Sequence, residues 1–131
     1  MTVLNYHLDR EAMEARDPED LVVIMRPSRW GNPIRLGMVI DGRKIGRGDA
    51  ILHHRRHLAG EIFSGRLPLG DLAALHGKDL VCCCAPRPCH GHVLERAAAW
   101  AHGMLQRPEK LARFNAFVER RAGAEPAAPA P

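Results

Sequence analysis

The residues best suited to chemistry in this chain are concentrated in one short stretch, residues 80–94. All four cysteines of the chain and two of its eight histidines lie there. They are Cys82, Cys83, Cys84, Cys89, His90 and His92. Thiolates and imidazoles are preferred ligands of zinc, and a thiolate beside an imidazole is also a nucleophile with a proton acceptor. The stretch therefore predicts either a metal centre or a reactive thiol.

The metal interpretation follows from strand geometry. Residues two apart on an extended strand face the same way, so Cys82 and Cys84 share a side, and Cys89 returns after a loop. His90 or His92 can supply the fourth ligand, and a zinc set of three cysteines and His90 is the expected site. A three-cysteine iron–sulfur cluster is a second candidate cofactor.

The thiol interpretation uses the helix that is expected to begin near Val93. Cys89 and His90 lie just before its first turn, where free N–H groups and the helix dipole stabilise an anion. That anion is either a Cys89 thiolate, with His90 or His92 as the proton acceptor, or a bound phosphate contacted by His92. In the structural alternative the cysteines are only small core residues, which is how we interpret Cys83.

Two buried strands are expected to position these residues. Leu80–Ala85 is an apolar run that ends at two prolines, and Leu21–Met25 has the continuous apolar pattern of a central strand covered on both faces. In open α/β sheets, ligands bind at the carboxyl ends of the strands, where loops connect each strand to the following helix. We therefore expect the segments after both strands to meet at one edge of the sheet.

The segment after the first strand reads Arg-Pro-Ser-Arg-Trp-Gly-Asn-Pro over residues 26–33. Two prolines, a glycine and an asparagine favour a loop of fixed shape. A tryptophan between Arg29 and Gly31 offers a stacking face with cations beside it. In the structural alternative, the tryptophan fills the core and the arginines are solvated. The residues expected to contact a ligand are Arg26, Ser28, Trp30, Gly31 and Asn32.

The remaining pattern predicts a single α/β domain over residues 21–121, with a short, mostly parallel sheet flanked by helices and a hairpin insertion at Asp41-Gly42. Residues 1–20 are expected to form an irregular or weakly helical lead-in, and residues 122–131 a disordered tail. Helices are expected at 50–63, capped by Asp49, and at 71–76, 93–102 and 109–121. The basic run 53–57 is expected to form a solvated helix face, and Trp100 to lie in the core.

Composition narrows the function classes. The 131 residues carry a net charge of +4, a mild preference for phosphate-bearing partners such as nucleotides or nucleic acid. No run of about 18 apolar residues is present, so no membrane span is expected. Clustered cysteines without an export signal predict thiols or metal ligands in the reducing cytoplasm. The sequence leaves the oligomeric state open.

The two motifs, residues 26–33 and 77–94, together resemble the family catalogued as domain of unknown function 4326, whose members occur in bacteria and phages. The resemblance covers about residues 21–102. Cys83 stands where the family commonly has an aromatic residue, and His92 where it commonly has an acidic one, which favours His90 as the fourth ligand. The Cys-His step before a helix is also similar to a small α/β family that carries Cys-His-Arg there.

Three functions are consistent with these residues. The first is a small enzyme acting on a nucleotide or nucleic-acid component, with Cys89 and His90 as its reactive or metal-assisted centre. The second is a zinc-stabilised module that binds nucleic acid through the basic helix and performs no catalysis. The third is a thiol or iron–sulfur protein that handles sulfur.

Overall fold

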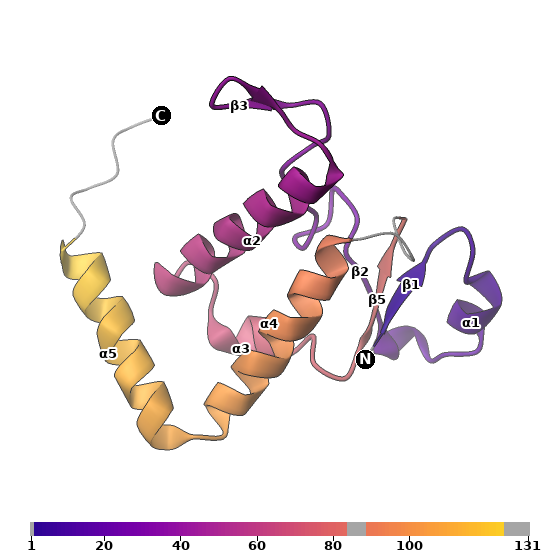
Figure 1. Cartoon of the computed structure of the whole chain (residues 1–131). Helices are drawn as coiled ribbons and strands as arrows, with labels where there is room; N and C mark the ends of the chain where they lie inside the picture. Colours follow the sequence, from indigo (N-terminus) through magenta and orange to yellow (C-terminus); the bar gives the residue numbers. More distant parts are fainter. Residues whose placement is uncertain (1, 84–88, 125–131) are drawn as a thin grey trace.

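The structure, a computed structural model, describes residues 2–83 and 89–124. A three-stranded parallel sheet lies at its centre, in the order β1-β5-β2 (Figure 1). The strands are β1 (Val3–Asn5), β2 (Leu21–Val23) and β5 (Asp79–Cys82). The expected class, a small α/β domain with a mostly parallel sheet, is confirmed. The central strand is β5, in which Leu80 and Val81 are fully buried at 0% exposure, as a strand covered on both faces requires.

The order of the strands differs from the prediction in two places. The run Leu21–Met25 yields an edge strand, β2, in which Val23 is 48% exposed, so the expectation of a central strand there is wrong. The lead-in is not wholly irregular, because Val3–Asn5 pairs with β5 through Val3↔Leu80 and Asn5↔Cys82. A strand of three residues is too short for its periodicity to be visible in the sequence.

The five helices of the described residues pack around this sheet and against one another. They are α1 (Arg10–Glu14), α2 (Arg47–Phe63), α3 (Leu69–Ala73), α4 (His90–Leu105) and α5 (Pro108–Ala124), with a 3-10 turn at Pro18–Asp20. Helix α1 lies on one side of the sheet, and α2, α3 and α4 lie on the other (Figure 1). In the described ranges no helix combines the length and the apolar composition needed to cross a bilayer.

Helix α4 is longer than the sequence pattern predicts. It begins at His90 rather than Val93, with Cys89 as its N-cap, and it continues through Gly103 to Leu105. Its side chains Leu94, Ala98 and Ala101 are fully buried, and this packing outweighs the weak helix propensity of Gly103. The Cys-His pair therefore lies in the first turn of the helix.

The expected hairpin is confirmed in shortened form. Strands β3 (Val39–Ile40) and β4 (Arg43–Lys44) pair antiparallel around Asp41 and Gly42. Both turn residues have positive φ, 51° and 77°, as the Asp-Gly hairpin turn requires. The next helix, α2, then begins three residues earlier than expected, with Gly46 as its N-cap. The Asp49 carboxylate accepts a hydrogen bond from the Gly46 amide at 3.4 Å, so Asp49 supports the helix start from within the first turn.

Aromatic side chains join α2, α4 and α5. Trp100, expected in the core, is 39% exposed, and its ring lies 6.4 Å from Phe63 and 5.7 Å from Phe114. It is therefore a contact between helices at the surface, and its assignment to the core is wrong. Part of the predicted tail is helical, because α5 extends to Ala124, and residues 125–131 lie outside the described residues.

Candidate functional site

The carboxyl ends of β2 and β5 lie side by side and bring two distant segments together. Val23 is in register with Val81, and the Ile24 amide donates to the Val81 carbonyl at 2.9 Å. The chain after β2 enters the loop 26–33, and β5 ends at Cys82. The two strand ends therefore meet at one sheet edge, as predicted, and residues 84–88 of the segment after β5 lie outside the described residues.

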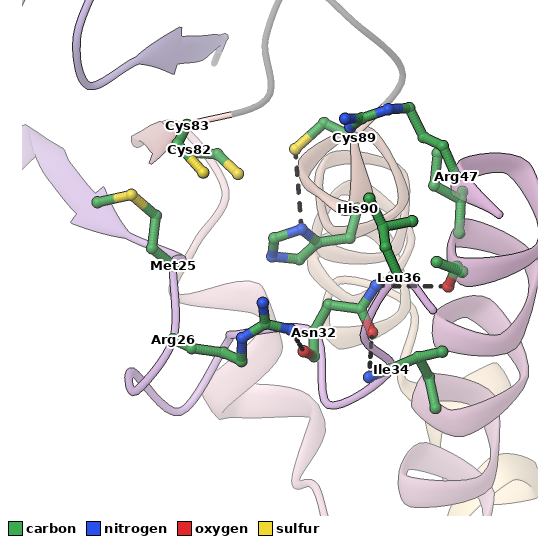
Figure 2. A pocket seen from close by; sticks show the side chains of 12 residues that line it. Met25, Arg26, Asn32, Ile34, Leu36, Arg47, Cys82, Cys83, Cys89 and His90 are labelled. Carbon is green, nitrogen blue, oxygen red and sulfur yellow. Dashed lines mark hydrogen bonds between the residues drawn. The ribbon is translucent and has the colours of Figure 1, made fainter. Parts of the chain in front are cut away.

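A cavity of about 280 Å³ lies at this edge. Residues from both strand ends line it, together with the first turns of α2 and α4 (Figure 2). Its polar lining consists of Arg26, Asn32, Arg47, Cys82, Cys83, Cys89 and His90. Figure 2 shows the Arg47 side chain extending from α2 toward the start of α4. Two helix N-termini and two arginines therefore border one small space, which favours an anionic ligand.

Three of the four predicted metal ligands come together at this cavity. The thiol sulfurs of Cys82 and Cys89 and a ring nitrogen of His90 all lie within 4.8 Å of one another. The three residues are 2%, 2% and 7% exposed, and neither cysteine is in a disulfide bond. Cys84, the fourth predicted ligand, lies outside the described residues. Soft donors in this number and at this spacing are compatible with metal binding.

The orientation of the His90 ring is fixed by a backbone contact. Nε2 lies 2.9 Å from the carbonyl oxygen of Ile24, and Nδ1 lies 3.7 Å from the sulfur of Cys89. A carbonyl oxygen only accepts, so Nε2 carries the proton and donates it. In the neutral ring, Nδ1 then has a lone pair directed toward the Cys89 sulfur, which suits either proton transfer or metal ligation.

Cys89 is held by the helix that it caps. Its sulfur accepts a hydrogen bond from the amide of Gly91 at 3.3 Å, which favours the thiolate over the thiol. The first turn of α4 sits tight against the sheet, since a Cβ at Gly91 would lie 2.9 Å from Ile24 Cδ1 and 3.1 Å from Val3 Cγ1. The glycine of the Cys-His-Gly sequence therefore permits the approach that brings the sulfur to β5.

The loop 26–33 is braced by its own residues. The Arg26 guanidinium donates to the carbonyl oxygen of Asn32 at 2.9 Å, and Asn32 Oδ1 accepts from the Ile34 amide at 2.9 Å. A Cβ at Gly31 would lie 2.9–3.0 Å from atoms of Arg26, so this turn has no room for a larger residue. Arg26 and Asn32 therefore reach the cavity from a fixed loop, as the prolines and glycine predict.

Other predicted contact residues lie elsewhere. Trp30 and Gly31 line a second cavity of about 190 Å³ on α2, and His92 lines an apolar groove between α2 and α4. The Ser28 hydroxyl oxygen is buried, without a hydrogen-bond partner among the described residues. Cys83, expected in the core, is exposed and borders the first cavity, so that assignment is wrong. Of the predicted ligand contacts, the first cavity therefore gathers Arg26 and Asn32.

The sequence patterns do not identify two residues that the structure places at the site. Arg47 was not singled out, although it comes three residues before the buried Ala50, on the same helix face. His54 was assigned to the solvated face, yet it is 3% exposed, and its ring lies edge-on to His90 with 5.0 Å between centroids. The spacing of four from Ala50 to Leu58, with residue 54 midway, is the pattern that places it inside.

His54 adds a neutral polar group behind the cluster. Burial, with smaller contributions from His90 and His57, lowers the pKa of His54 from 6.5 to about 4. Its Nδ1 atom is buried without a hydrogen-bond partner among the described residues. His54 is therefore uncharged at neutral pH and adds no positive charge beside His90.

Comparison with known proteins identifies a family but no characterised relative. A family model described as "Domain of unknown function (DUF4326)" matches residues 7–100, well over half of the 131-residue chain. The matched range contains both the loop 26–33 and the Cys/His cluster. No curated protein and no solved structure matches the chain.

Proposed function

The chain belongs to the DUF4326 family, and from that premise and the geometry of its site we propose that it is a small enzyme acting on a phosphate-bearing molecule of the nucleotide class. One observation carries the proposal. The Cys82/Cys89/His90 cluster borders the same cavity as Arg26, Arg47 and the first turns of α2 and α4. An anion-binding site and a reactive centre thus share one space.

Binding is assigned to the arginines and the helix ends. Arg47 lies in the first turn of α2, and α4 starts at His90, so the positive ends of two helix dipoles border the cavity. Arg26 is held by Asn32 at the opposite wall. A phosphate group with charge near −2 is the ligand fragment that matches this lining.

The chemistry is assigned to Cys89 and His90. The Gly91 amide stabilises the Cys89 thiolate, and His90 Nδ1 is placed 3.7 Å away to take the thiol proton. Such a thiolate either attacks an electrophilic carbon or ligates a metal ion, and both uses place the reacting atom of the bound molecule beside this pair. A reducing cytoplasmic environment would keep both cysteines in the thiol form.

Calorimetric titration of the full chain with inorganic phosphate and with the four nucleoside 5′-monophosphates tests the binding step. Arg47→Gln is expected to weaken binding by about tenfold to a hundredfold, the loss of one charge-assisted hydrogen bond. Arg107→Gln is the control, because Arg107 is exposed and is not among the cavity residues. Equal binding by the two variants, or no binding of any probe to the unmodified chain, would contradict the proposal.

A nucleic-acid-binding module is the second candidate function. Arg55 and Arg56 are exposed on α2 and give this helix two solvent-facing cations. Duplex DNA affinity that falls with salt, and falls further in Arg55→Gln/Arg56→Gln but not in Arg47→Gln, would favour this second function over the enzyme.

A further inference from the structure

The Cys82/Cys89/His90 cluster has the donor spacing of a tetrahedral metal site. Metal–sulfur and metal–nitrogen bonds of about 2.3 and 2.0 Å at a tetrahedral angle put a sulfur and a nitrogen about 3.5 Å apart. The Cys89 sulfur and His90 Nδ1 are 3.7 Å apart, and all three donor atoms lie within 4.8 Å. Only small side-chain adjustments would be needed to enclose an ion.

The contacts around His90 prepare one nitrogen for ligation. Nε2 donates to the Ile24 carbonyl at 2.9 Å, which fixes the tautomer and leaves the Nδ1 lone pair toward Cys89. A ligating histidine ordinarily donates its other N–H to a carbonyl or carboxylate in this way. His90 is 7% exposed, so the ring has little freedom to turn away.

The donor set also selects the ion. Two thiolates and an imidazole are soft ligands that suit zinc and disfavour magnesium or calcium, which prefer oxygen. Three donors are present among the described residues, and Cys84, the further cysteine expected as a ligand, lies outside them. All three donor residues line the 280 Å³ cavity, which Arg26 and Arg47 also line.

We propose that Cys82, Cys89 and His90 bind a divalent ion of the zinc class, with His90 ligating through Nδ1. Any contact between the ion and a molecule in the cavity rests on the proposed function, whereas the metal site itself does not. Binding converts two thiols to thiolates, so up to two protons are released for each ion bound.

Cobalt titration of the reduced, chelator-treated full chain tests the site directly. Saturation near one ion per chain is expected, with thiolate-to-cobalt absorption in the near ultraviolet and the strong visible bands of tetrahedral cobalt. Added zinc should then bleach both. Absence of these bands, or a spectrum without thiolate absorption, would overturn the proposal.

Paired variants locate the ligands. Cys89→Ser, Cys82→Ser and His90→Gln are each expected to lower cobalt affinity by about a hundredfold or more. Cys83→Ser and His92→Gln are the matched controls, because each is an exposed neighbour of the same residue type. Circular dichroism checks that each variant is folded. If a ligand variant unfolds, the intensity of the thiolate-to-cobalt absorption of the unmodified chain still gives the number of thiolate ligands. Equal losses in Cys83→Ser and Cys89→Ser would refute the assignment.

Different results would contradict the proposed metal site and the proposed function. Arg47→Gln leaves all three donors in place, so it should bind cobalt normally while losing phosphate affinity. If the unmodified chain binds cobalt but neither phosphate nor nucleotide, the proposed metal site is supported and the proposed function is contradicted. If the chain binds phosphate but no cobalt, the proposed metal site is contradicted and the binding step of the proposed function is supported.

Discussion

The side-chain amide of Asn5 donates a hydrogen bond of 3.1 Å to the carbonyl oxygen of Cys83, which lies 78 residues later in the sequence. The first strand of the chain thus holds the end of the strand that carries the cysteines. Asn5 is 5% exposed, and its Oδ1 atom also accepts from the amides of His7 and Leu8 at 2.8 and 3.0 Å. One buried amide therefore joins β1, the turn after it and the edge of the site.

Asn5→Ala is expected to lower the free energy of unfolding by about 1–3 kcal/mol, because three backbone groups lose partners in partly buried hydrogen bonds. Urea denaturation followed by circular dichroism measures this change. Asn115→Ala on the exposed face of α5 is the control and should stay within about 0.5 kcal/mol of the unmodified chain. A similar small effect for Asn5→Ala would show that the amide does not hold the strand end.

Two glycines of α4 should respond in opposite ways to alanine. A Cβ at Gly91 would press on Ile24 and Val3, and we expect Gly91→Ala to cost about 1–3 kcal/mol of stability. A Cβ at Gly103 meets nothing within 4 Å, so Gly103→Ala should stabilise by up to about 1 kcal/mol through helix propensity. Thermal denaturation of both variants checks the contrast, and equal shifts would rule out the close contact at Gly91.

Replacing His54 by leucine is expected to raise stability at pH 7 by about 1 kcal/mol, because a buried nitrogen without a partner is replaced by an apolar side chain of similar size. Chemical denaturation measures the difference. His57→Leu, one turn away and exposed, should change stability by less than about 0.5 kcal/mol. A clear loss of stability in His54→Leu would mean that the imidazole makes a stabilising interaction.

Gly31→Ala should lower phosphate affinity about tenfold, since its Cβ would collide with Arg26 and displace the loop that reaches the cavity. Calorimetric titration with inorganic phosphate gives the affinity. Gly60→Ala, farther along α2, is the control, because a Cβ there meets nothing within 4 Å and Gly60 does not line the cavity. Unchanged affinity in Gly31→Ala would remove the loop from the binding site.

Much of the fold and part of the site follow from local patterns. The apolar run at Leu80 predicts the buried strand, and Asp41-Gly42 predicts the hairpin. The motif spacing predicts that Cys82, Cys84, Cys89 and His90 converge, and the three of them that the structure describes lie together. These predictions succeed because strand alternation, turn preferences and short loops depend on neighbours in sequence. The short strand β1 and the exposure of Trp100 and Cys83 depend on distant contacts, and local patterns misassign them.

The sequence by itself identified the residues whose types suit chemistry and predicted that the ends of two strands meet at one edge of a parallel sheet. Only the tertiary structure decided their roles. It turned Trp30 toward a different cavity from Arg26, brought Arg47 and buried His54 to the cluster, and directed His90 Nδ1 at Cys89 through the Ile24 carbonyl. The physical reason is that side-chain direction at a site is set by packing and hydrogen bonds between segments far apart in sequence, which local spacing does not encode.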